Sequence, residues 1–153
     1  MLSSQTAFSQ LYKNPDAPIE ARVTDLLGRM TLEEKVLQLT QYTLGRNNNA
    51  NNLGEKIQKT PAGTGSLIYY EISPSLRNRL QQKAVEESRL GIPLLFGFDA
   101  IHGFRTVYPI PLAQACAWNP SLVEKACAVS AQEARMSGVD WTFSPMIDVA
   151  RDP

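Results

Sequence analysis

The chain has 153 residues, which is enough for one hydrophobic core of ordinary size. Its 15 lysines and arginines balance its 15 aspartates and glutamates, so the formal net charge is zero. This balance argues against a nucleic-acid groove or an anionic membrane surface as the main partner, and no apolar run in the sequence is long enough to span a bilayer.

The first residues are polar and show neither the basic nor the apolar region of a signal peptide. We therefore expect a disordered or extended leader over residues 1–17, followed by one partial domain over residues 18–153. Because no signal is visible, two alternatives remain: the protein is cytoplasmic, or it is exported and an upstream signal has been lost.

Two amphipathic helices are expected after the leader. Pro18 suits the first turn of a helix, whose apolar face has residues at helical spacing: Ile19, Val23, Leu26, Leu27 and Met30. Residues 31–34 form a capping box, in which Thr31 and Glu34 each satisfy a free backbone N–H. The helix that follows is expected to bury Leu32, Val36 and Leu39.

The middle of the chain predicts a strand and a third helix. The asparagine-rich residues 47–52 indicate a mobile loop or a small insertion. Gly63 and Gly65 lead into a strand over residues 66–70, and they match no trusted phosphate-loop pattern. Ser73 and Pro74 start a helix that Gly91 is expected to stop. The inner stripe of this helix consists of Leu76, Leu80 and Ala84.

The second half predicts a strand, a loop, a helix and a strand. Residues 92–98 are almost continuously apolar, as in a strand buried on both faces of a parallel sheet. A long loop is expected over residues 100–118, and an alanine-rich helix from Asn119 to Gly138. Residues 141–143 form a second buried strand, so the two strands should be parallel neighbours.

Asp99 follows the first of these strands, at the end where parallel α/β folds bind ligands. Sequence alone leaves open whether its carboxylate binds a ligand or caps the following turn. His102, the only histidine, lies in a glycine-flanked turn and has no partner for a metal site or a serine relay. We expect it to support the loop by donating to a backbone carbonyl.

Other candidate residues favour structural roles. Glu133 is expected to make an ion pair or a cap, Trp118 and Trp141 to pack in the core, and Arg105 to be an exposed loop charge. Asp148 and Asp152 follow the second strand and are expected to fix loops, with substrate contact as the alternative. The two cysteines are expected to be small buried thiols and not a disulfide: Cys116 and Cys127.

Four segments in this order resemble glycoside hydrolase family 3, and especially its bacterial periplasmic β-glucosidases. Residues 30–36 resemble its opening helix, and residues 97–103, GFDAIHG, resemble its G-x-D-x-x-H-G segment. Residues 106–112 resemble its T-x-[FY]-P-x-P stretch. Residues 133–153 resemble the segment that in the family continues into R-W-G-R, so Arg151 does not match the sugar-binding arginine at the end of that segment.

The resemblance implies an α/β fold, the first part of a (β/α)8 TIM-type barrel, and retaining, exo-acting hydrolysis of terminal β-glucosyl residues. A barrel needs roughly 250 residues, so we expect an amino-terminal fragment that stops after about two barrel strands. The family's nucleophilic aspartate and acid/base glutamate match no residue here, so we assign no catalytic residue and expect the fragment alone to be inactive. Asp99 matches the aspartate that accepts the hydroxyls at carbons 4 and 6 of the sugar.

The expected partner is therefore a β-glucoside or oligosaccharide, with no nucleic acid, membrane, cofactor or metal. The resemblance implies a periplasmic or secreted protein, although no signal is visible. Two alternatives remain: another specificity of the family, either β-xylosidase or β-N-acetylhexosaminidase, or a non-catalytic sugar-binding or interaction remnant. The sequence does not indicate the oligomeric state.

Overall fold

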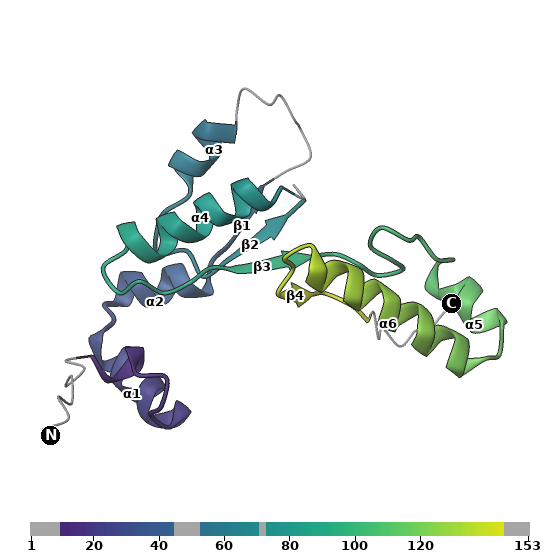
Figure 1. Ribbon diagram of the computed structural model, residues 1–153, viewed down its shortest axis with the longest axis horizontal. Coiled ribbons are helices and arrows are strands. Elements are labelled where there is room, and N and C mark those ends of the chain that lie inside the picture. Colours follow the sequence, from purple (N-terminus) through teal and green to yellow (C-terminus); the bar gives the residue numbers. More distant parts are fainter. Residues whose placement is uncertain (1–9, 45–52, 71–72, 146–153) are drawn as a thin grey trace, which may run out of the picture. The chain divides into compact units, whose positions relative to one another are not determined.

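The computed structural model describes residues 10–44, 53–70 and 73–145 (Figure 1). The chain divides into two compact units, Met1–Leu37 and Gln38–Pro153. None of the helices in the described ranges is long and apolar enough to cross a membrane.

The first unit is a short 3-10 helix, η1 (Leu11–Lys13), followed by α1 (Ile19–Arg29). Pro18 is the residue before α1, as the sequence predicts. The buried Tyr12 joins the two elements, because its backbone N–H donates to the Asp25 carboxylate at 3.0 Å and its carbonyl accepts from Arg22 at 3.0 Å. Polar contacts of the backbone therefore connect η1 with α1.

Helix α2 (Leu32–Leu39) begins with the predicted capping box. The Thr31 N–H donates to the Glu34 carboxylate at 2.9 Å, and the Glu34 N–H donates to the Thr31 hydroxyl at 3.2 Å. The predicted burial of the apolar stripe of α2 is wrong, since Leu39 is 89% exposed, and α1 buries no residue either. The pattern identified an apolar face, but no element among the described residues covers it. The exposed members of the two stripes are Ile19, Val23, Leu27, Leu32, Val36 and Leu39.

The second unit contains a sheet of four parallel strands whose order in space is their order in the chain. The described residues thus hold four strands, where the sequence analysis expects about two. Strand β2 is predicted by the sequence, whereas the half-polar β1 is not. The strands are β1 (Gln41–Leu44), β2 (Ser66–Tyr69), β3 (Leu95–Phe98) and β4 (Trp141–Thr142).

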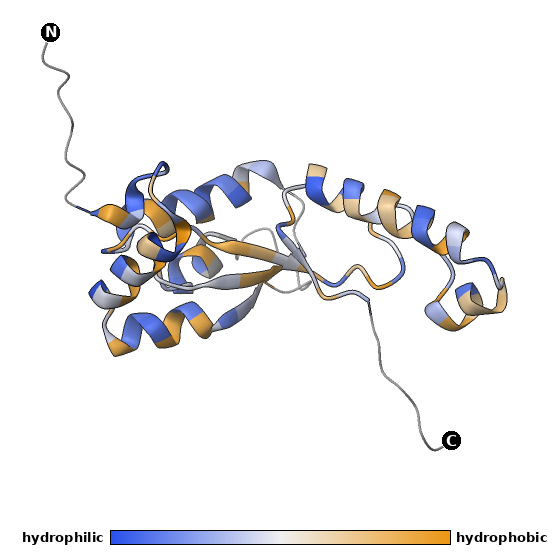
Figure 2. Ribbon diagram, turned by 90° about the horizontal axis from the view of Figure 1, so that it is seen from below, coloured by the Kyte–Doolittle hydropathy of each residue, from blue (hydrophilic) through white to orange (hydrophobic). Residues whose placement is uncertain are grey.

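Helix α4 (Pro74–Glu87) lies along one face of the sheet and builds the core with it (Figure 1). Its predicted cap is present, since the Ser73 hydroxyl accepts from the Leu76 N–H at 3.4 Å. The helix ends at Glu87, before the predicted stop at Gly91. Hydrophobic residues run along the strands beneath it (Figure 2). The core also includes one residue of α3 (Leu53–Lys59) and consists of Leu44, Ile57, Leu67, Tyr69, Leu76, Leu80, Ala84, Leu94 and Phe96.

Helices α5 (Pro111–Cys116) and α6 (Pro120–Met136) follow β3. The region predicted as one long loop therefore contains the short helix α5. Helix α6 begins at the predicted cap, where the Asn119 side chain accepts from the Leu122 N–H at 3.2 Å. Gly138 follows its end with φ of +86°, a conformation that favours glycine. In both views α6 runs beyond the strand ends (Figures 1 and 2).

The predicted βαβ unit is confirmed, because β3 and β4 are parallel neighbours with α6 between them in the chain. The expectation that β3 is buried on two faces is wrong, and so is the predicted burial of β4. Phe96 is fully buried, while Leu95 is 49% exposed and Trp141 is 44% exposed. Alternate residues of a strand face opposite sides of the sheet. One side of β3 therefore belongs to the core, and the other is open among the described residues.

Candidate functional site

Asp99 lies directly after the last residue of β3, at the carboxyl end of the parallel sheet. Its side chain is exposed, and among the described residues its carboxylate accepts no hydrogen bond and makes no ion pair. The turn-capping alternative thus finds no contact in the described ranges. A free carboxylate at this position can accept hydrogen bonds from two neighbouring hydroxyl groups of a ligand.

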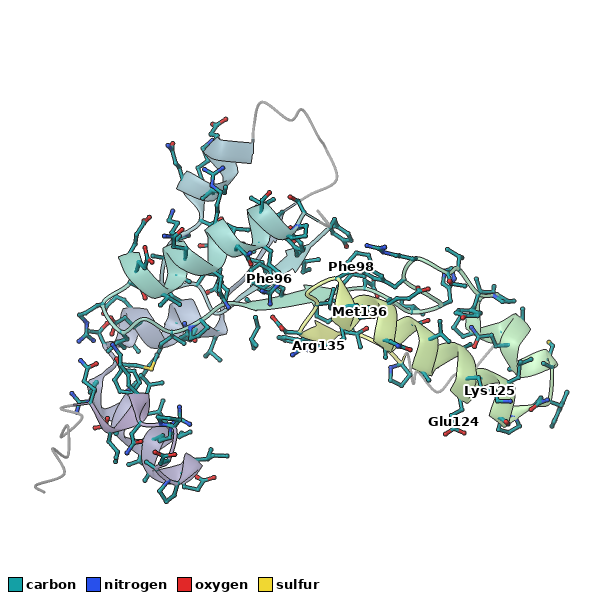
Figure 3. All side chains as sticks on the ribbon, viewed as in Figure 1. Phe96, Phe98, Glu124, Lys125, Arg135 and Met136 are labelled. Carbon is teal, nitrogen blue, oxygen red and sulfur yellow. The ribbon has the colours of Figure 1, made fainter. Side chains whose placement is uncertain are left out.

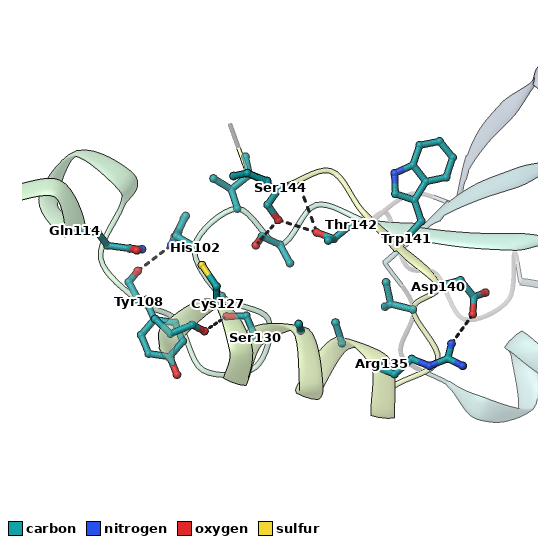
Figure 4. A pocket seen from close by; sticks show the side chains of 18 residues that line it. His102, Tyr108, Gln114, Cys127, Ser130, Arg135, Asp140, Trp141, Thr142 and Ser144 are labelled. Carbon is teal, nitrogen blue, oxygen red and sulfur yellow. Dashed lines mark hydrogen bonds and ion pairs between the residues drawn. The ribbon is translucent and has the colours of Figure 1, made fainter. Parts of the chain in front are cut away.

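The segment after Asp99 closes into a loop at His102 and Tyr108. The Tyr108 N–H donates to the His102 carbonyl at 2.7 Å, and His102 Nδ1 lies 2.9 Å from the Tyr108 carbonyl (Figure 4). Because a carbonyl oxygen only accepts, Nδ1 carries the proton in this contact. The predicted supporting role of His102 is therefore confirmed.

Gly103 allows this loop to close tightly. It pairs with Val107 in an isolated antiparallel bridge, and its φ of +132° is rarely adopted by residues with a side chain. A Cβ atom at this position would also collide with the Thr106 carbonyl. The backbone geometry of the loop therefore explains why the last residue of the GFDAIHG segment is a glycine.

Glu133 anchors the tip of the same loop from α6. Its Oε2 accepts from the N–H groups of Arg105 and Thr106, both at 2.9 Å, and its Oε1 accepts from the Thr106 hydroxyl at 2.6 Å. The Thr106 hydroxyl and amide hold the pKa of the Glu133 carboxyl below its usual value, against a small opposing effect of desolvation. Arg105 also lowers this pKa through its backbone N–H and its charge. The predicted structural role of Glu133 is confirmed.

Aromatic rings connect the loop tip to the strand that precedes Asp99. The Phe104 ring meets the Phe98 ring edge to face, with centroids 4.7 Å apart, and Phe98 contacts Tyr70 in the same manner at 5.6 Å. Below the loop, the Ser144 hydroxyl donates to the Ala100 carbonyl at 3.0 Å. The sequence analysis did not identify these contacts. The only available signal was the position of Ser144 just after a predicted strand.

A polar network at the opposite end of β3 joins three elements. Asp140 accepts from Arg77 of α4 at 3.1 Å, from Arg135 of α6 at 3.0 Å, and from the Phe96 N–H at 3.2 Å. The Arg77 guanidinium also lies over the Phe96 ring, 4.6 Å from its centroid, and donates to the Gly138 carbonyl at 2.7 Å. Arg77 and Phe96 are far from Asp140 in the chain, and no sequence pattern predicted these contacts.

A hollow of about 490 Å³ lies between α6 and the segments that follow β3 and β4 (Figure 4). Its walls are mostly apolar, and Asp99 is not among the residues that line it. The Ser130 hydroxyl in its wall donates to the Ala126 carbonyl at 2.9 Å. The hollow therefore does not contain the carboxylate that the sequence analysis singles out.

Several side-chain predictions need correction. Cys116 and Cys127 are free thiols, as expected, but both are exposed, and Cys127 borders the hollow. Trp118 and Trp141 do not pack in a core, because their exposed fractions are 92% and 44%. The Arg105 side chain is exposed, as predicted, although its backbone N–H binds Glu133. Asp148, Arg151, Asp152 and the predicted loop 47–52 lie outside the described residues.

Gly65, directly before β2, has a structural explanation. A Cβ atom at Gly65 would collide with the Gln38 carbonyl, so the close approach of two backbone segments explains this glycine. The described ranges contain no group of three or more histidine, cysteine, aspartate or glutamate side chains that could hold a metal ion.

Comparison with known proteins gives a consistent set of matches. The sequence model described as "Glycosyl hydrolase family 3 N terminal domain" matches residues 31–153. The periplasmic β-glucosidase of Salmonella typhimurium is 38% identical over 99% of this chain and 20% of that protein. A putative β-xylosidase of Formosa agariphila is 33% identical over 99% of this chain and 22% of that protein.

Solved structures agree with these matches. The β-glucosidase of Listeria innocua in complex with glucose has a TM-score of 0.73 and 38% identity, covering 88% of this chain and 20% of that one. A variant of the same enzyme in complex with laminaribiose gives the same values. The chain thus spans about a fifth of the length of the relatives it matches.

Proposed function

Because this chain belongs to glycosyl hydrolase family 3, we propose that it supplies the substrate-binding Asp99 to a retaining, exo-acting β-glucosidase. The four parallel strands and their helices are the first part of the family's TIM-type barrel. In such barrels the residues that bind and transform substrate come from the carboxyl ends of the strands. We infer the function of the whole protein from its membership of this family and from this shared architecture.

The observation that carries this proposal is the exposed carboxylate of Asp99 at the carboxyl end of β3. An ionised carboxylate only accepts, so it suits two neighbouring sugar hydroxyls, which we assign to carbons 4 and 6 of the terminal glucose. Hydrogen bonds of this charge-assisted kind contribute about 1.5–3 kcal/mol each. Asp99 would therefore select the sugar and hold it.

Bond cleavage needs a second pair of groups, a nucleophilic carboxylate and an acid/base carboxyl, about 5 Å apart in retaining enzymes. Glu133 is fully engaged with Arg105 and Thr106, so it is a poor candidate for either role. We propose that both catalytic carboxylates lie outside this fifth of the enzyme. The 153-residue chain alone should then give no hydrolysis of aryl β-glucosides.

Kinetics on the gene product that carries this chain test the proposal. We expect Asp99→Ala to lower kcat/KM for p-nitrophenyl β-D-glucoside by about 10- to 100-fold or more, which corresponds to the loss of at least one charged hydrogen bond. The loss should be smaller for the β-xyloside, because xylose lacks the carbon-6 hydroxyl. Glu124→Ala, which changes an exposed carboxylate on α6, is the matched control (Figure 3).

Equal activity of the Asp99→Ala variant and the parent protein would refute the assignment of Asp99. An equal loss on the glucoside and the xyloside would refute the carbon-6 contact. Hydrolysis by the pure 153-residue chain would refute the placement of the catalytic carboxylates.

The match to a putative β-xylosidase supports a second specificity within the family. The ratio of kcat/KM values for the β-glucoside and the β-xyloside decides between them, and a β-N-acetylhexosaminide completes the set. Laminaribiose is a suitable natural substrate to include, since a Listeria relative binds it. Failure to hydrolyse any of these, together with binding of glucose, would favour the non-catalytic sugar-binding alternative.

We also propose that the protein is periplasmic. Two similar proteins are named periplasmic, the β-glucosidase of Salmonella typhimurium and a β-glucosidase/β-xylosidase of Dickeya chrysanthemi. Fractionation of the native cells tests this, and recovery of the protein with the cytoplasmic marker would contradict it.

A further inference from the structure

Hydrogen bonds hold the loop between β3 and α5 at three places along its length. At the start of the loop, the Ser144 hydroxyl donates to the Ala100 carbonyl. Further along, His102 and Tyr108 pair across the loop and close it. At its tip, the Glu133 carboxylate accepts three hydrogen bonds from Arg105 and Thr106. The position of the tip therefore depends on this carboxylate.

The tip is connected to Asp99 through one ring contact. Phe104 lies next to Arg105 in the chain, and its ring packs against Phe98 with centroids 4.7 Å apart. Phe98 directly precedes Asp99. A shift of the tip would therefore move the Phe104 ring and change the packing of the residue before the sugar-binding carboxylate.

We propose that Glu133 is a positioning residue for substrate binding: it holds the loop tip so that Phe104 and Phe98 fix the orientation of Asp99. This inference rests on the proposed function, because it assigns Glu133 a role in the same site. Glu133 touches no substrate itself. It acts from the last turn of α6, through the loop.

The chemistry of the contacts supports this role over that of an ordinary surface cap. One carboxylate receives two backbone N–H groups and a hydroxyl, so both of its oxygens are used. The carboxyl is charged near neutral pH, and the Thr106 contacts, with a smaller effect of the Arg105 charge, lower its pKa further. A charged acceptor forms stronger hydrogen bonds than a neutral one.

A double-mutant cycle on the gene product that carries this chain tests the inference. We expect Glu133→Ala to lower kcat/KM for p-nitrophenyl β-D-glucoside about tenfold or more, since small misplacements of a binding group are costly. Most of the loss should appear as a higher KM, because Asp99 binds hydroxyls away from the scissile bond. In the Asp99→Ala background, the same change should cost about twofold or less.

Milder variants separate positioning from general loss of structure. Glu133→Gln keeps one acceptor oxygen and should lose less than the alanine variant. Thr106→Val removes only the hydroxyl contact and should lose the least. Glu124→Gln on the same helix is the control. Thermal unfolding of each variant checks that the protein is folded.

The outcomes distinguish this inference from the function on which it rests. Equal fold losses from Glu133→Ala with and without Asp99 would show that Glu133 acts independently of Asp99 and would overturn the inference. Normal activity of a folded Glu133→Ala variant would also overturn it, while a loss in Asp99→Ala would leave the function standing. A gene product that neither hydrolyses β-glucosides nor binds glucose would refute both.

Discussion

The second unit has two regions that are stabilised differently. In the first region, α4 packs on β1, β2 and β3, and Leu67, Leu80 and Phe96 are at most 1% exposed. In the second region, formed by α5, α6 and β4, Leu112 is 73% exposed and Leu122 is 56% exposed. The first region thus has a hydrophobic core, and the second is attached to it mainly by polar contacts.

This difference explains how the candidate site is held. Strand β3 belongs to the packed region, so the backbone that leads to Asp99 starts from a rigid element. The loop after Asp99 belongs to the open region, where hydrogen bonds to Glu133 and Ser144 fix it. Substitutions should therefore affect stability in the first region and geometry in the second.

The largest expected effect contrasts matched leucines of the two regions. Leu80→Ala should reduce the free energy of unfolding by about 2–5 kcal/mol, because it opens a cavity in a closed core. Leu122→Ala should change it by less than about 0.5 kcal/mol, because its side chain is already exposed. Urea unfolding of both variants measures the contrast, and equal losses would show that α6 is as well packed as α4.

The helix starts could be predicted because their chemistry is local. Ser73 with Pro74 and Asn119 with Pro120 place a cap and a proline at adjacent positions, and both helices begin there. His102 and Glu133 also have the structural roles that the sequence analysis expects. For the helix caps and His102, the residue type and its neighbours determine the role, whereas the partners of Glu133 lie 27 and 28 positions away.

Burial and long-range pairing could not be predicted in this way. Trp118 and the α2 stripe that includes Leu39 are apolar but exposed. An apolar pattern does not indicate which other element, if any, packs against it. The contact of Arg77 with Asp140 joins residues 63 positions apart. Strand β1 was missed because its residues are half polar, and the partner strand, not local propensity, defines it.

The second prediction concerns the polar junction between the two regions. Asp140→Ala leaves Arg77, Arg135 and the Phe96 N–H without their shared acceptor, so we expect a loss of about 1–3 kcal/mol in the free energy of unfolding. Asp140→Asn, which keeps an acceptor oxygen, should lose less. A loss as large as that of Leu80→Ala would mean that the junction matters as much as the core.

A third prediction compares the two helix caps. Ser73→Ala and Asn119→Ala each remove one acceptor from a helix start and should each destabilise their helix by about 1 kcal/mol. The loss at α4 should appear in global urea unfolding. The loss at α6 should appear first as faster amide exchange in its opening turn. Identical global losses would contradict the separation into a packed and an open region.

The smallest expected effect is the response of the loop tip to acid. The pKa of Glu133 lies below its usual value in the folded protein, so its contacts to Thr106 stabilise the fold above the ordinary pKa of glutamate. This contribution is lost as the pH falls through the lowered pKa, because a protonated carboxyl is a weaker acceptor. Amide exchange at Arg105 and Thr106 should therefore rise in acid, relative to the packed strand β2. Glu133→Gln should remove this dependence on pH, since its amide does not titrate, and a variant that keeps it would show that another group controls the loop.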